Sequence, residues 1–151
     1  MKSCVLLGHR DCPQNIRQKL YDTIENLILH CGVDVFYVGT HGNFDRLAYD
    51  VLCDLEKKYP ITTIVVLAYL NVKSNLCYDR AKTVFPSVLE NTPARYAIVK
   101  RNQYMIDNAN YLACYIDNSI SNMYSFVKRA IKKNLKIINL GKFDVRGLTN
   151  I

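Results

Sequence analysis

Residues 4–8 have the sequence Cys-Val-Leu-Leu-Gly, a wholly apolar run that ends at a glycine. Because apolar and polar residues do not alternate along it, the run predicts a strand buried on both faces, as in parallel sheets. Residues 13–31 then place apolar side chains three and four positions apart, the spacing of a buried helical stripe. Gly32 is suited to end that helix. The N-terminal stretch therefore predicts a strand followed by a helix.

The rest of the chain repeats this alternation. Further strands are predicted at residues 35–38, 62–68, 111–116 and 136–140. Further helices are predicted at residues 44–59, 100–108 and 123–131. We therefore expect an α/β fold, a Rossmann-like, doubly wound and mostly parallel sheet of about five strands flanked by helices. A single domain over residues 1–151, with a tail from residue 141, accounts for the pattern.

The periodicity fails between residues 69 and 97, where Pro86, Pro93 and several asparagines occur. A connection of that length is unusual in a compact domain, so we expect a binding loop or a short unrecognised element there. A short strand or turn is expected at residues 96–99.

The composition excludes several classes of protein. Half of the 151 residues are apolar and 22% are charged, which excludes a disordered chain. The longest apolar run, residues 64–70, is too short to span a membrane, and the N-terminal run is too short for a signal peptide, so a cytoplasmic protein is expected. The six cysteines form no C-x-x-C pair and have no histidine at zinc-finger spacing, so we predict no metal site and no cofactor.

The net charge of +7 lies in the C-terminal half of the chain. Residues 1–75 carry eight basic and eight acidic side chains, and a cluster of lysines and an arginine occupies residues 128–136. Cations near the end of a helix complement its dipole. That explanation is favoured over a nucleic-acid surface, which would show a wider basic face with aromatic residues.

Two loops that follow predicted strands carry candidate ligand-binding residues, because ligands of doubly wound sheets bind at the carboxyl ends of strands. In the first, residues 8–13, backbone amides and Arg10 are suited to an anion, although a plain turn also explains the sequence. In the second, residues 39–45, two glycines permit close approach to a ligand, and Asp45 stands in the first turn of the next helix. This second loop could fit a ribose or a phosphate, and a purely structural turn explains its sequence equally well.

A third candidate is the pair Arg101-Asn102 on a short predicted helix. If this helix lies beside the first loop, both side chains reach a bound ligand. If it does not, Arg101 is a surface charge.

Taken in order, these motifs resemble those of a known family. Gly8-His9-Arg10, then Gly39-x-x-Gly42-x-Phe44-Asp45-x-x-Ala48, then Lys100-Arg101-Asn102-x-x-Met105-x-Asp107 resemble the SLOG superfamily of Rossmann-like proteins, and within it the YpsA-like branch. The likeness spans about residues 3 to 141. It implies a nucleotide or nucleotide-derived ligand, such as an ADP-ribose-like or NAD-like molecule, at the carboxyl edge of the sheet. Related proteins include phosphoribohydrolases and the DNA-processing protein DprA.

The loops and the resemblance together predict a set of ligand-binding residues: Gly8, His9, Arg10, Gly39, Thr40, Gly42, Asp45, Arg101, Asn102 and Ser119. The sequence departs from the family in two places. Residues 118–123 contain no glycine, so this loop is a poorer phosphate cradle, although Ser119 keeps a hydroxyl donor. The phosphoribohydrolase pattern Pro-Gly-Gly-x-Gly-Thr is absent, which weakens the case for catalysis.

Three functions follow, and whether the protein is an enzyme stays open. The first is binding or sensing of a nucleotide-type small molecule. The second is hydrolysis or transfer at an N-glycosidic bond, with Asp45 as the key carboxylate and His9 or His41 as the proton carrier. The third, less favoured, is binding of single-stranded nucleic acid by the basic C-terminal half. The sequence is also compatible with a homo-oligomer.

Overall fold

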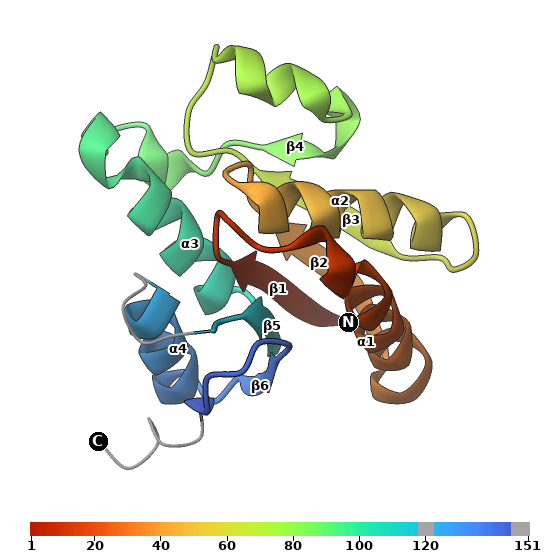
Figure 1. Ribbon diagram of the computed structural model, residues 1–151. Helices are drawn as coiled ribbons and strands as arrows, with labels where there is room; N and C mark the ends of the chain where they lie inside the picture. The colour runs from red at the N-terminus through yellow and green to blue at the C-terminus, as the bar shows by residue number, and fades with distance from the viewer. Residues whose placement is uncertain (118–122, 146–151) are drawn as a thin grey trace.

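The apolar run at the start of the chain forms the centre of the sheet. The computed structural model describes residues 1–117 and 123–145. Strand β1 (Lys2–Gly8) pairs with β2 (Val33–Val38) on one side and with β5 (Tyr111–Tyr115) on the other. The strand order is β4-β3-β2-β1-β5-β6, and every pairing is parallel (Figure 1). The order reverses beside β1, which is where doubly wound sheets place their ligand crevice.

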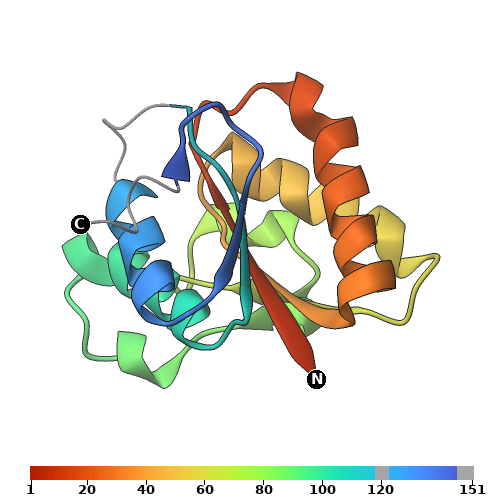
Figure 2. The same cartoon turned by 90° about the horizontal axis from the view of Figure 1, so that it is seen from below.

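The other elements confirm the predicted α/β class. The remaining strands are β3 (Thr62–Val66), β4 (Thr83–Val84) and β6 (Lys136–Asn139). The helices are α1 (Arg17–Cys31), α2 (Asn43–Glu56), α3 (Ala97–Asp107) and α4 (Met123–Lys132). Helices α1 and α2 cover one face of the sheet, and α3 and α4 cover the other (Figures 1 and 2). The sixth strand, β4, lies outside the five that the sequence predicts.

Each face of the sheet packs its own apolar core. Leu6 of β1 packs in the core with Val51 of α2, and both side chains are fully buried. Val5, the neighbour of Leu6, lies in the opposite core with Ile106 of α3 and Val127 of α4. Successive strand residues point to opposite faces, so a strand with helices on both faces needs apolar residues at every position. This explains why β1 shows no alternation.

The stretch between β3 and α3 contains short helical turns and the two-residue strand β4. Four 3₁₀ turns lie there: Lys73–Cys77, Arg80–Lys82, Ser87–Leu89 and Ala94–Tyr96. The last of these leads directly into α3, so the strand or turn expected at residues 96–99 is wrong. The apolar pair Ile98-Val99 belongs to the first turn of α3, which therefore begins earlier than the periodicity predicts.

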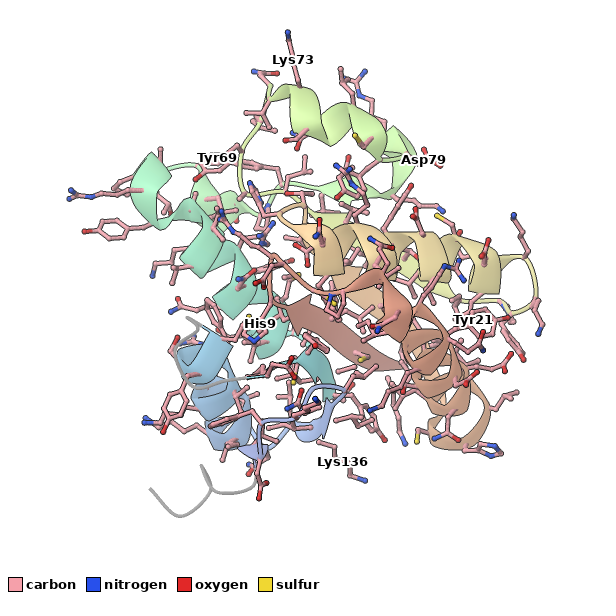
Figure 3. All side chains as sticks on the ribbon, in the orientation of Figure 1. His9, Tyr21, Tyr69, Lys73, Asp79 and Lys136 are labelled. Carbon is pink, nitrogen blue, oxygen red and sulfur yellow. The ribbon has the colours of Figure 1, made fainter. Side chains whose placement is uncertain are left out.

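Part of this stretch packs against α2. The ring of Tyr78 meets that of Tyr49 edge-on, with ring centroids 4.8 Å apart. Lys82 forms an ion pair with Glu56 at 2.5 Å. Figure 3 shows Tyr69, Lys73 and Asp79 on this stretch, at the opposite end of the molecule from Lys136. These contacts hold the stretch against the middle and the end of α2.

Residues after β6 are tied to the end of β5 by the side chain of Asn139. Its Oδ1 accepts hydrogen bonds from the backbone N–H groups of Ile116 and Gly141, both at 2.9 Å. Its Nδ2 donates to the carbonyls of Ile116, at 3.1 Å, and Phe143, at 2.7 Å. Within the predicted tail, residues 141–143 are therefore hydrogen-bonded to residues at the ends of β5 and β6. Residues 146–151 lie outside the described residues.

In the described ranges, no helix is both long and apolar enough to cross a membrane.

We predict that Asn139→Ala lowers the free energy of unfolding by about 2–4 kcal/mol, because partly buried backbone groups lose their partners together. Urea denaturation measures this change. The matched control is Asn108→Ala, since Asn108 is exposed and its amide donates to one carbonyl, that of Tyr104, at 2.7 Å. Equal losses in the two variants would contradict the role of Asn139.

Candidate functional site

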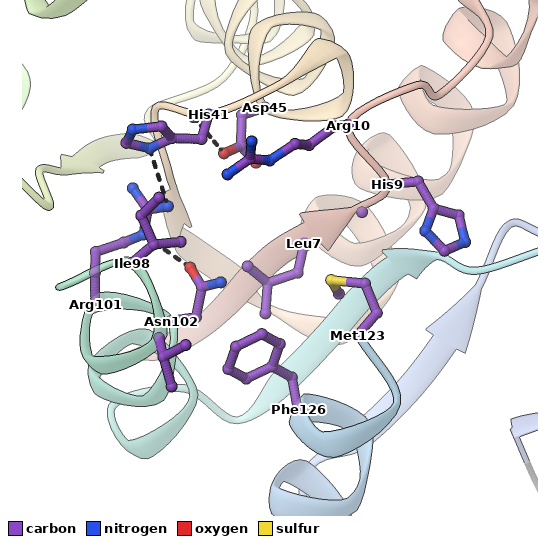
Figure 4. A pocket seen from close by; sticks show the side chains of 12 residues that line it. Leu7, His9, Arg10, His41, Asp45, Ile98, Arg101, Asn102, Met123 and Phe126 are labelled. Atoms are coloured by element: carbon purple, nitrogen blue, oxygen red, sulfur yellow. Dashed lines mark hydrogen bonds between the residues drawn. The ribbon is translucent and has the colours of Figure 1, made fainter. Parts of the chain in front are cut away.

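A pocket lies at the carboxyl end of β1. Its volume is about 230 Å³, and it is lined by the end of β1, the loops after β1 and β2, and residues of α3 and α4 (Figure 4). This is the edge of the sheet that the sequence predicts for a ligand. The pocket brings together most of the predicted site residues.

The loops after β1 and β2 touch because glycines leave room. A Cβ atom on Gly8 would lie 2.4 Å from the ring of Phe44. Gly42 has a φ of +95°, and a Cβ there would lie 2.7 Å from the Cα of Arg10. The backbone N–H of Asn43 donates to the carbonyl of Arg10 at 2.8 Å. These glycines allow one loop to approach the other, whereas close approach to a ligand stays a prediction.

Helix α3 lies beside the loop after β2 and brings Arg101 under it. The Arg101 side chain is 1% exposed, so it is not a surface charge. Its Nη1 donates to Thr40 Oγ1 and to the carbonyl of Val66, both at 3.2 Å, and its Nε donates to Asn102 Oδ1 at 2.8 Å. The guanidinium thus joins α3 to the ends of β2 and β3.

Asp45 is a buried carboxyl group at the start of α2. It is 4% exposed, and its Oδ2 accepts a hydrogen bond from the backbone N–H of His41 at 2.9 Å. Burial raises the pKa of Asp45 to about 6, although the nearby charge of Arg101, the His41 hydrogen bond and Arg10 all favour the ionised form. Asp45 therefore changes its charge close to neutral pH.

His41 faces the same cluster as a neutral ring. Its Nδ1 lies 3.1 Å from Thr40 Oγ1 and 3.4 Å from Arg101 Nη2. A guanidinium only donates hydrogen bonds, so Nδ1 is the acceptor and Nε2 carries the proton. Burial, followed by the charges of Arg101 and Arg10, lowers the pKa of His41 to about 4. The sequence had offered His41 only as an alternative proton carrier.

His9 lies on the other side of the pocket. Its Nε2 accepts a hydrogen bond from the backbone N–H of Asp117 at 3.0 Å, and its ring meets that of Tyr115 edge-on. Figure 4 shows the His9 ring turned away from Asp45. In this arrangement Nε2 is engaged by the end of β5, so His9 and Asp45 do not form a pair.

Arg10 and Asn102 present polar groups to the pocket. Arg10 is exposed, unlike Arg101. Asn102 Oδ1 is held by Arg101, which leaves the Nδ2 amide directed into the pocket (Figure 4). A cation and an amide donor therefore lie on the side where Asp45 supplies an acceptor.

The opposite wall of the pocket is apolar. It is formed by Leu7, Met123 and Phe126, while Ile98 lies across the pocket beside Arg101 (Figure 4). Sequence reasoning missed these residues as site residues, because apolar residues of strands and helices also fit a buried core, and Leu7, Met123 and Phe126 do belong to one. The pocket thus has a polar half and an apolar half.

Two predicted features remain to be placed. Ser119 lies outside the described residues. Among the described residues, no group of three His, Cys, Asp or Glu side chains is arranged to hold a metal ion.

Comparison with solved structures finds the X-ray structure of DNA processing protein A (DprA) from Streptococcus pneumoniae. The TM-score is 0.71 at 15% sequence identity, and the match covers 99% of this chain and 54% of DprA. The chain therefore spans about half the length of that protein. No family model and no curated protein sequence matches it. At this identity the likeness concerns the fold, and the chain has the Rossmann-like α/β fold seen in DprA.

Proposed function

We propose that this protein binds a nucleotide or nucleotide-derived ligand in the pocket at the end of β1, as a member of the SLOG superfamily and of its YpsA-like branch. The observation that carries the proposal is the division of the pocket into a polar half with Arg10 and Asp45 and an apolar half with Phe126. A nucleotide is divided in the same way, into a phosphorylated sugar and a flat base. The place of the pocket in the strand order supports the proposal.

The polar half supplies complementary groups for a phosphorylated ribose. The guanidinium of Arg10 is exposed and suits a phosphate, which it binds through two parallel hydrogen bonds. The carboxylate of Asp45 accepts hydrogen bonds from sugar hydroxyl groups. The amide of Asn102 donates to a sugar or phosphate oxygen.

The apolar half suits the base. Phe126 and Met123 of α4 face Ile98 of α3 across the pocket (Figure 4). Aromatic rings and thioether sulfur pack well against flat π systems. The volume of about 230 Å³ is smaller than that of a site enclosing a whole drug-sized ligand, so part of a dinucleotide would extend into solvent.

The burial of Asp45 also supports a binding role. A carboxyl group whose pKa is raised by burial costs stability whenever it is ionised. Strongly perturbed carboxyl groups beside pockets are typical of functional sites, where stability is exchanged for activity.

Binding accounts for the geometry better than turnover does. Cleavage of an N-glycosidic bond needs a carboxylate near the sugar, which Asp45 supplies, and a proton carrier. His9 is engaged with Asp117, and the lowered pKa of His41 makes it a poor proton donor at neutral pH. Cleavage with Asp45 therefore stays the alternative.

Binding of single-stranded nucleic acid is the second alternative. Arg129 and Lys133 of the basic cluster form ion pairs with Asp107, at 2.7 and 3.9 Å. These contacts favour a local role at the end of α4 for part of the cluster.

We predict that Arg10→Gln weakens the binding of AMP, ADP-ribose or NAD by about tenfold or more, because a charge-assisted contact with phosphate is lost. Adenosine, which has no phosphate, should lose little affinity. Isothermal titration calorimetry measures both. Arg46→Gln is the matched control, since Arg46 is exposed on α2 and does not line the pocket. Native protein that binds none of the three nucleotides would refute the proposed function.

A second prediction concerns Asp45→Asn and pH. The folded pKa of about 6 lies above the ordinary value of 3.8, so the stabilising contribution of the protonated carboxyl is complete below about pH 4 and is lost as the pH rises through 6. Asn stays neutral and keeps an acceptor for the His41 N–H. We therefore expect the free energy of unfolding of the variant to exceed that of the native protein by about 3 kcal/mol at pH 8. This difference should disappear near pH 4.

Urea denaturation between pH 4 and 8 provides the measurement. Asp54→Asn is the control, because Arg17 lowers the pKa of the half-buried Asp54, and that substitution should lower the free energy of unfolding at neutral pH. If the free energy of unfolding of Asp45→Asn did not rise relative to that of the native protein as the pH increases, the ionised Asp45 would not destabilise the fold. Calorimetry with AMP should show weaker binding to Asp45→Asn than to the native protein. Chromatography of AMP incubated with each protein tests the alternative of cleavage, and equal, negligible release of base by both would exclude it.

A further inference from the structure

We propose that Arg101 is a positioning residue, which holds the loop after β2 and the Asp45 carboxylate in place and acts on the ligand through them rather than by contact. The sequence motif predicts that Arg101 touches the ligand, as Arg10 does. The inference rests on the proposed function of the pocket.

Four of the five N–H donors of Arg101 have partners within the protein. Its Nε serves Asn102, its Nη1 serves Thr40 and the carbonyl of Val66, and its Nη2 faces His41 Nδ1. The side chain is 1% exposed, the lowest exposure of any charged residue in the described part of the chain. Arg101 is among the residues that line the pocket, but a ligand would have to displace these partners to take over most of its hydrogen bonds. Arg10, being exposed, is open to a ligand without any such exchange.

Gly39 brings Arg101 close to Asp45. A Cβ atom on Gly39 would lie 2.8 Å from Asp45 Oδ2 and 2.9 Å from Arg101 Cζ. The carboxyl oxygen and the guanidinium carbon therefore approach the same side of Gly39, within about 6 Å of each other. At this separation in a buried site the positive charge stabilises the carboxylate without a direct ion pair.

Other charged or titratable groups around Asp45 are weaker partners. Arg10, from the loop after β1, is exposed and therefore screened by water. His41 is neutral, since its pKa is lowered to about 4, and burial raises the pKa of Tyr78 to about 12, so it is neutral too. Arg101 is the buried cation next to Asp45.

The consequence for ligand binding is indirect. Without the guanidinium the carboxyl group of Asp45 would hold its proton to higher pH and would no longer accept hydrogen bonds from sugar hydroxyl groups at neutral pH. Asn102 would also lose the contact that turns its amide into the pocket. The affinity lost on removing Arg101 should therefore return as the pH rises and Asp45 ionises.

The test compares Arg101→Gln with Arg10→Gln by calorimetry with AMP between pH 5 and 9. For Arg101→Gln we expect the pH midpoint of binding to rise by about one unit or more, with an alkaline affinity within about tenfold of the native value. For Arg10→Gln we expect a loss at every pH and a smaller change of midpoint. A pH-independent loss in Arg101→Gln would overturn the proposal, because it would indicate direct contact.

A second measurement needs no ligand, so it separates this inference from the proposed function. In the native protein, the ¹³C resonance of the Asp45 carboxyl and the ¹⁵Nε resonance of Arg101 should titrate with the same midpoint. In Arg101→Gln the Asp45 midpoint should rise, while in Arg101→Lys, which keeps the charge, it should stay closer to the native value. If Arg101→Gln does not fold, the native titration decides, and an Arg101 resonance that ignores the ionisation of Asp45 overturns the proposal.

Discussion

The buried guanidinium of Arg101 holds together three parts of the chain that meet at the carboxyl edge of the sheet. It enters from α3 and donates to the loop after β2 and to the last carbonyl of β3. Removing a charge from water costs several kcal/mol, on the order of the stability of a whole domain, unless hydrogen bonds replace its hydration. The polar atoms around Arg101 satisfy that condition. The position of α3 relative to β2 is therefore fixed by these hydrogen bonds as well as by apolar packing.

Gly39 makes this arrangement compatible with a second buried charge. Any side chain at this position would occupy the space between the Asp45 carboxyl and the guanidinium. Burial and the neighbouring cation act on Asp45 in opposite directions, and burial prevails. A carboxyl group balanced in this way responds to a ligand, because a ligand that adds hydrogen bonds to the carboxylate favours the ionised form.

Much of the fold could be predicted from the sequence, because apolar periodicity reports directly on burial. The run before Gly8 indicated a strand with helices on both faces, and β1 has that environment. The two residues of β4 carry no periodicity, and Ile98-Val99 fit a strand as well as the first turn of a helix. In these places the outcome depends on tertiary contacts rather than on the local pattern.

The sequence predicts the edge of the sheet where the candidate pocket lies, but not the surroundings of each residue there. The loops after β1 and β2 were found because polar residues follow buried strands. Of the two arginines, Arg10 is exposed and Arg101 is buried; the signal for burial is that Arg101 stands four positions from Ala97 and Met105, but it depends on a helix that begins earlier than the sequence predicts. Similarly, His9 and His41 both follow glycine-containing turns or strands, yet one binds the end of β5 and the other faces Arg101. The burial of a residue depends on which helix covers which strand end. The type of a residue and its position in a motif therefore indicate the region of a candidate site, but not the partners of that residue.

Because the match covers 54% of DprA, the properties of the whole DprA protein do not carry over to this chain, and its chemistry depends on the pocket itself. A shared Rossmann-like fold brings loops to the same edge of a sheet, but the chemistry there is set by side chains that 15% identity does not carry over. In this chain the polar half of the pocket combines one exposed cation with one buried carboxyl group, and the apolar half is built from core residues of β1 and α4. A ligand with a charge at both ends would place one charge against Phe126 and Met123, whose apolar side chains cannot solvate it. Under the proposed function, the pocket therefore favours a molecule that is anionic at one end and neutral and apolar at the other.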